Sequence, residues 1–172
     1  MFSDGDVSGS SGLRGFDRSL PMRLLRAHEA VLRTFIPHLK AHDLSTQQWR
    51  VMRVLVEYGE FDVTELAEAC SLLRPSVSRI VQNLEQREIV RRRACPADNR
   101  RSLVSITEKG RGLIAEIAPE SEARYRYIEN QFGADNLDEL YALLEQLVDA
   151  LAADPPAFGS LEGEADSDAP HD

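Results

Sequence analysis

A polar and basic helix surface in the middle of the chain holds the side chains best suited to recognition chemistry. On a helix from Pro75 to Glu88, Val77, Val81 and Leu84 share one face. The opposite face, its flanks and the residue before the helix offer small polar groups and arginines: Arg74, Ser76, Ser78, Arg79 and Asn83. Such a surface fits the major groove of DNA, where the first turn of a helix reaches base edges and phosphates. An ordinary solvated helix face is the alternative.

Arginines gathered just after this helix favour the first interpretation. Arg91, Arg92, Arg93, Arg100 and Arg101 fall within eleven residues. Asp98, two residues before Arg100, is placed to accept a hydrogen bond from its guanidinium and so to orient it. An arginine held in this way at the tip of a hairpin can enter the minor groove. A plain surface ion pair is the alternative for Asp98 and Arg100.

The charge of the chain is unevenly distributed. The formal net charge is −9, which by itself argues against a polyanionic partner. Residues 70–112, however, hold ten Lys and Arg against four Asp and Glu, whereas residues 155–172 hold five acids and no Lys or Arg. A basic region in an otherwise acidic chain is typical of a localised nucleic-acid surface.

Composition excludes several other classes of protein. The 172 residues are 42% hydrophobic and include two isolated cysteines, Cys70 and Cys95, so we expect no metal site, no cofactor and no disulfide. Redox sensing by either thiol is one hypothesis for these cysteines. The plainer interpretation is that Cys70 is buried and Cys95 lies in a loop. We expect no secretory leader and no membrane span, and we find no motif typical of an enzyme. We therefore expect a cytoplasmic protein that is not an enzyme.

The hydrophobic pattern predicts the elements that position these residues. Helices are expected over 19–41, 45–57, 64–70 and 75–88, then strands over 89–93 and 103–106 joined by a polar loop. Two helices follow, over 107–131 and 137–151, and Pro37 and Pro119 are expected to bend the helices that contain them. A helix, a short turn, a second helix and a charged hairpin predict a mainly α winged helix-turn-helix fold, of the α+β kind.

Several runs of this pattern together resemble the MarR family of bacterial regulators. The runs are Glu65–Ala69, Leu73–Ile80, Leu84–Glu85 and Arg100–Gly110. A closer resemblance, to the branch that regulates homoprotocatechuate (4-hydroxyphenylacetate) degradation, rests on Leu24–Ala30, His42–Arg50 and Leu72–Ser76. The family implies a regulator, commonly a repressor, that binds a pseudo-palindromic site on double-stranded DNA. By this resemblance Arg74, Ser76, Ser78 and Arg79 correspond to DNA contacts of the recognition helix, and Arg100 to the contact of the wing tip.

The family also implies a homodimer in which the N- and C-terminal helices of the two subunits intertwine. The sequence agrees, because one small lobe cannot bury both long apolar stripes, and an intramolecular bundle is the alternative. The expected dimerisation residues are Leu20, Leu24, Leu140, Leu144, Leu147 and Leu151. The predicted organisation is a disordered segment 1–18, a dimerisation helix 19–45, a DNA-binding lobe 46–106, dimerisation helices 107–152 and an acidic disordered tail 153–172.

A small-molecule effector is the last implication of the resemblance. The branch implies a small aromatic acid, whose carboxylate needs a guanidinium and whose ring needs an aromatic neighbour. The expected ligand residues are Arg26, His42, Trp49 and Arg50. A helical adaptor that binds another protein instead of DNA is the competing function.

Overall fold

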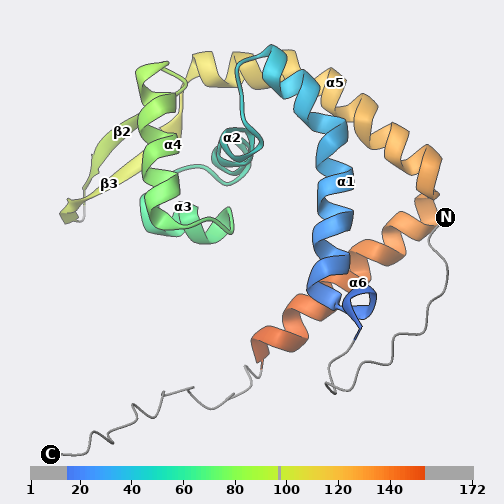
Figure 1. Ribbon diagram of the computed structural model, residues 1–172. Coiled ribbons are helices and arrows are strands. Elements are labelled where there is room, and N and C mark those ends of the chain that lie inside the picture. Colours follow the sequence, from blue (N-terminus) through green and yellow to red (C-terminus); the bar gives the residue numbers. More distant parts are fainter. Residues whose placement is uncertain (1–14, 97, 154–172) are drawn as a thin grey trace, which may run out of the picture. The chain divides into compact units, whose positions relative to one another are not determined.

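The computed structural model describes residues 15–96 and 98–153, apart from the side chains of residues 98–100 and 153. Most of the predicted disordered segment 1–18 and nearly all of the predicted tail 153–172 therefore lie outside the described residues. The elements follow in the order η1 (Phe16–Arg18), α1 (Leu20–Ala41), α2 (Thr46–Tyr58), β1 (Phe61–Asp62), α3 (Val63–Ala69), α4 (Arg74–Gln86), β2 (Val90–Cys95), β3 (Asp98–Ile106), α5 (Glu108–Phe132) and α6 (Ala134–Ala153). Helices with a short antiparallel sheet confirm the predicted mainly α winged fold (Figure 1).

The chain forms two compact units, one through Ile128 and one from Glu129 onward. In the first unit the core is a continuous apolar cluster that includes Leu39 of α1, Leu55 of α2, Leu66 of α3 and Val81 of α4. Cys70 is buried in the same cluster, as predicted, whereas Cys95, which was expected in a loop, is the last residue of β2. The second unit contains α6, whose apolar side chains are mostly exposed in the single chain.

The sheet has the strand order β1–β3–β2, with both neighbours antiparallel. Two features of it differ from the prediction. A third strand, β1, pairs Phe61 with Val104, and β3 begins at Asp98 and so takes in residues assigned to a loop. Hydrophobic periodicity reveals neither feature, because β1 has only two residues and β3 begins with the polar residues Asp98–Arg101.

Three connections in the first unit end a helix without a glycine. Asp43, Ser71 and Glu88 have φ values of 54°, 49° and 59°, and each follows the last turn of a helix. After α1, for example, Leu44 N–H donates to Leu39 O and Asp43 N–H donates to Lys40 O. This is the paired hydrogen-bond pattern that ends many helices, and it normally has glycine at the left-handed position. Both α1 and α5 continue through their internal prolines, Pro37 and Pro119.

Candidate nucleic-acid interface and effector pocket

Helix α4 stands next to the β2–β3 ribbon and follows α3 after a short turn (Figure 1). Pro75 lies in its first turn, where no intrahelical N–H is lost. Ser71, at φ 49°, and the hydrogen bond from Leu72 N–H to Ala67 O reverse the chain between the two helices. The turn therefore sets the direction in which α4 leaves α3.

The two faces of α4 are as predicted from the sequence. Val77, Val81 and Leu84 are completely buried, which fixes the rotation of the helix about its axis. The polar face is exposed at Arg74, Ser78, Arg79, Gln82, Asn83 and Gln86, and Ser76 is half-buried. The hydroxyl of Ser78 donates to Arg74 O over 3.1 Å, which leaves its oxygen lone pairs as acceptors. The structure thus presents these side chains together, and their contacts with DNA remain predictions.

Asn83 has an intramolecular partner that the sequence pattern did not indicate. Its Oδ1 accepts a hydrogen bond from Gln48 Nε2 of α2 over 2.7 Å. Gln48 Oε1 in turn accepts from the backbone N–H of Ser45 over 2.8 Å, which completes the capping box at the start of α2. The side chain of Asn83 therefore connects α4 to α2.

The β2–β3 ribbon is the wing. Two of its arginines are bound to carboxylates that lie just before α3 or in its first turn. Arg93 Nε lies 3.1 Å from both carboxylate oxygens of Glu60. Arg101 Nε donates to Asp62 over 2.8 Å and its Nη2 donates to Glu65 over 2.7 Å. Their charges are neutralised locally, so they hold the wing against the lobe.

The remaining described arginines of the wing are held more loosely. Arg91 Nε donates to Ser105 Oγ over 3.2 Å, and Arg92 Nε lies 3.3 Å from Glu85. The side chains of Asp98 and Arg100 lie outside the described residues, so their proposed pairing stays a prediction.

Asp62 and Glu65, which bind Arg101 of the wing, also cap α3. Asp62 accepts from the backbone N–H groups of Thr64 and Glu65 at 2.8 and 2.9 Å, and Glu65 accepts from Asp62 N–H, so the pair caps α3. The Glu65 N–H and then Arg101 lower the pKa of Asp62, and Arg93 lowers the pKa of Glu60. A capping box joins residues three positions apart and is a local pattern, whereas the contacts of the wing with it join residues 36 and 39 positions apart and leave no local signal.

A pocket of about 280 Å³ between α1, α2 and α5 contains the aromatic and basic groups that an aromatic acid needs. Its lining residues are Val31, Leu32, Phe35, Leu39, Thr46, Trp49, Arg50, Arg53 and Tyr125. The rings of Phe35 and Tyr125 pack with their centroids 5.0 Å apart. Arg53 lies over the ring of Trp49, with 6.0 Å from its guanidinium carbon to the ring centroid.

Two of the four predicted ligand residues line this pocket. Trp49 and Arg50 do, although Arg50 Nη1 already donates to Cys70 O over 2.9 Å. Arg26 instead pairs with Asp17 at 3.2 Å, and His42 lies 3.6 Å from Glu116. Sequence reasoning missed Arg53, although its spacing of four residues from Trp49 on one helix was a usable signal.

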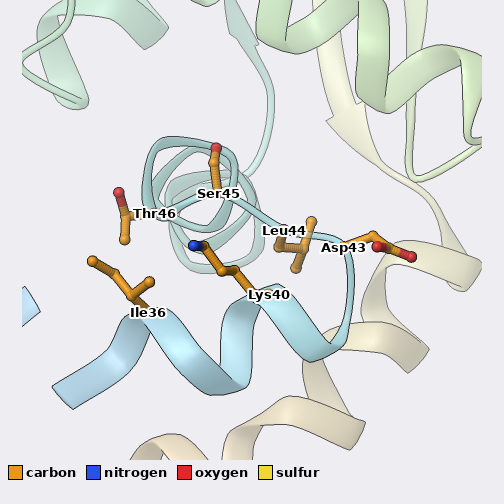
Figure 2. A pocket seen from close by; sticks show the side chains of 6 residues that line it. All are labelled: Ile36, Lys40, Asp43, Leu44, Ser45 and Thr46. Atoms are coloured by element: carbon orange, nitrogen blue, oxygen red, sulfur yellow. The ribbon is translucent and has the colours of Figure 1, made fainter. Parts of the chain in front are cut away.

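A larger pocket, of about 570 Å³, lies at the connection between α1 and α2. It is lined by Ile36, Lys40, Asp43, Leu44, Ser45 and Thr46. Figure 2 shows the Lys40 nitrogen directed toward the start of α2 and the Asp43 carboxylate directed away from it. This pocket offers an amine but no aromatic ring, so the smaller pocket fits an aromatic acid better despite its volume.

The expected dimerisation residues are largely uncovered in the single chain. Leu20 and Leu24 on α1 are exposed, as are Leu140, Leu144 and Leu151 on α6, and Leu147 is half-buried. Residues 15–96 and 98–153 contain no cluster of potential metal ligands. Within the same ranges no helix is long and apolar enough to cross a membrane.

Comparisons with known proteins agree with this geometry. A model of the MarR family matches residues 42–101. The homoprotocatechuate degradative operon repressor of Escherichia coli is 37% identical over 130 residues, which cover 76% of this chain and 88% of the repressor.

Two solved structures extend the comparison. NadR in complex with 4-hydroxyphenylacetate shares 34% identity, with a TM-score of 0.69 over 78% of this chain and 96% of NadR. The repressor CouR bound to a 23-mer DNA duplex shares 26% identity, with a TM-score of 0.71 over 77% of this chain and 94% of CouR. These relatives are regulators, in agreement with the prediction of a non-enzyme, and none supports the adaptor alternative.

Proposed function

Because this chain belongs to the MarR family of transcriptional regulators, we propose that it represses its target genes as a homodimer and that a small aromatic acid releases it from DNA. The observation that carries the proposal is the polar face of α4, exposed beside a basic wing. Because its proposed partner is DNA, we propose a cytoplasmic location as well.

The orientation of α4 supports the proposed DNA contact. Its apolar face is buried against the core, so Arg74, Ser78 and Arg79 project from the opposite, exposed side. A recognition helix reads base edges from its first turns, and arginine is the most frequent reader of guanine. The wing adds a second contact, through Arg100 at its tip, oriented by Asp98.

Dimerisation accounts for the exposed apolar side chains at both ends of the described chain. Leucines on α1 and α6 gain about 25 cal/mol for each Å² of apolar surface that a partner covers. A two-fold symmetric dimer presents two copies of α4, and its binding site on DNA is accordingly a pseudo-palindrome.

The smaller pocket is the proposed effector site. The Arg53 guanidinium is suited to the carboxylate of an aromatic acid, while Trp49, Phe35 and Tyr125 enclose its ring. Trp49 and Arg50 remain from the sequence prediction, and Arg53 takes the place that the sequence assigned to Arg26. The complex of NadR with 4-hydroxyphenylacetate supports this ligand class.

One titration tests the proposal. The purified protein is mixed at two salt concentrations with labelled DNA from upstream of its own gene, with and without 4-hydroxyphenylacetate. Arg79→Ala is the test variant, and Arg111→Gln on the exposed surface of α5 is its control. We expect salt-sensitive binding that Arg79→Ala weakens and that the acid reverses.

Other results have distinct meanings. Binding that no aromatic acid alters would remove the effector and leave the repressor. A complete lack of binding at both salt concentrations would refute the DNA-binding function proposed for this surface.

A further inference from the structure

The connection between α1 and α2, residues 42–45, is attached to the recognition helix at two points. One attachment runs through Gln48 and the other through Arg87. Both contacts lie within the first compact unit. Both are polar contacts whose residues lie outside the apolar core cluster.

The Gln48 attachment joins the start of α2 to α4 through a single side chain. Its Oε1 accepts from Ser45 N–H over 2.8 Å, and its Nε2 donates to Asn83 Oδ1 over 2.7 Å. Because one planar amide group makes both bonds, a rotation of the first turn of α2 must move Asn83 or break one of them.

The Arg87 attachment joins the end of α1 to the end of α4. Arg87 Nη1 donates to Asp43 O over 2.8 Å, and Nη2 lies 3.4 Å from His42 O. Its own backbone N–H caps α4 by donating to Asn83 O over 3.2 Å. A cation against carbonyls at the C-terminal end of a helix is stabilised by the helix dipole.

The two attachments act on one face of α4. Asn83 and Arg87 are four residues apart and therefore neighbours on the helix surface. Between them the connection places Leu44 in the core, with 3% of its surface exposed. Hydrogen bonds thus hold the 42–45 connection to the last turns of α4 on both sides of the buried Leu44 side chain.

The same connection separates two walls of the effector pocket. Leu39 belongs to the last turn of α1 before it, and Thr46 and Trp49 belong to the first turn of α2 after it. A ligand that changes the spacing of α1 and α2 therefore acts on both attachments at once. Conversely, a displacement of α4 on DNA acts on the shape of the pocket, since coupling between two sites is reciprocal.

We propose that Gln48 and Arg87 are positioning residues that couple the pocket between α1, α2 and α5 to the recognition helix α4. The inference rests on the proposed function, because it assigns the means by which that pocket and the DNA surface communicate. Neither residue needs to touch the effector or the DNA.

Trp49 provides a readout that does not require an effector. It is the only tryptophan of the chain, it lines the pocket, and it follows Gln48 directly. Its emission is recorded as unlabelled DNA from the upstream region is added, for the wild type and for Gln48→Ala/Arg87→Gln. The matched control is the double variant Gln47→Ala/Arg111→Gln, in which both substituted residues are exposed.

The expected result is a change of Trp49 emission on saturation with DNA in the wild type and in the control pair. The same change is lost in Gln48→Ala/Arg87→Gln, although labelled DNA still binds that variant and thermal unfolding shows it folded. An unchanged emission in the wild type, or an equal change in the double variant, would overturn the coupling. With Gln48 intact, Arg87→Lys, which keeps the charge and its N–H donors on a single nitrogen, is expected to retain more of the response than Arg87→Gln.

A second arm measures the ratio of DNA dissociation constants with and without saturating 4-hydroxyphenylacetate. Couplings of this kind are about 5- to 150-fold, and we expect the double variant to fall below about twofold while it still binds the acid. A wild type that does not bind the acid refutes the proposed effector, and the Trp49 arm alone then decides the coupling. A double variant that keeps the full ratio overturns it.

Discussion

The imidazole of His38 on α1 and the hydroxyl of Ser121 on α5 form a hydrogen bond in the interior of the first unit, with 3.0 Å between Nε2 and Oγ. Both residues are buried, with 3% and 2% of their surfaces exposed. Burial, and next the positive charge of Arg124, lower the pKa of His38, while Glu120 on α5 opposes the shift. The neutral imidazole is therefore the form that the fold accommodates.

This pair predicts that the protein loses stability in mild acid. The unfolded chain binds a proton at His38 near pH 6.5 and the folded chain only at lower pH, so stability falls as the pH drops below 6.5. The loss ends once the pH passes below the lowered pKa of the folded state. Urea unfolding at pH 7.5 and 5.5, at one protein concentration, measures it, and His38→Gln should flatten the dependence. An equal pH dependence in His38→Gln would assign the effect to other groups.

Arg53 should control the affinity for aromatic acids. A hydrogen bond to a charged group contributes about 1.5–3 kcal/mol, so Arg53→Ala should weaken 4-hydroxyphenylacetate by about tenfold or more. DNA binding without the acid should be retained. Isothermal titration calorimetry checks the affinity, with Arg33→Ala on the exposed part of α1 as the control. Equal affinities in wild type and Arg53→Ala would move the carboxylate site elsewhere.

Arg79 and Arg101 should affect DNA binding in different ways. Arg79 is exposed on α4, and if it neutralises a phosphate, Arg79→Ala lowers the slope of log K against log salt by about 0.9. Arg101 is already paired with Asp62 and Glu65, so Arg101→Gln should weaken binding by misplacing the wing and leave the slope unchanged. Anisotropy titrations over a range of salt separate the two effects. A lower slope in Arg101→Gln would place its charge on DNA.

Gly110 and Gly112, two residues apart in α5, should respond oppositely to alanine. A Cβ on Gly110 would collide with Ile89 O and lie 2.7 Å from Ile106 Cγ1, whereas a Cβ on Gly112 meets no atom within 4 Å. Gly110→Ala should therefore cost about 1–3 kcal/mol, and Gly112→Ala should stabilise the helix by up to about 1 kcal/mol. Thermal unfolding of both variants measures the difference. Equal melting temperatures would contradict the close approach of α5 to Ile89 and Ile106.

The exposed leucines of α6 should hold the proposed dimer together. Leu144→Asp/Leu151→Asp places two charges on the apolar stripe, and desolvating them in an interface is costly. We expect a monomer by light scattering and a loss of DNA affinity. Gln146→Asp on the same helix adds an exposed charge beside the stripe and serves as control. A double variant that stays dimeric would exclude this stripe from the interface.

The sequence determined the helices of this protein and the two faces of α4. Apolar residues that recur every three or four positions are a local property, and burial of Val77, Val81 and Leu84 follows from the pattern directly. The capping box at Ser45 and Gln48 could be predicted for the same reason, since its partners are three residues apart.

Only the tertiary structure decided how these elements are connected. Arg101 joins the cap of α3, Gln48 reaches Asn83, and Tyr125 packs against Phe35 in the pocket. Each of these contacts brings together residues from distant parts of the chain. A polar side chain of this kind carries no periodic signal, because its partner is chosen by the packing of the apolar core and not by its sequence neighbours. Recognition surfaces follow from local pattern, whereas the contacts that position them follow from the fold.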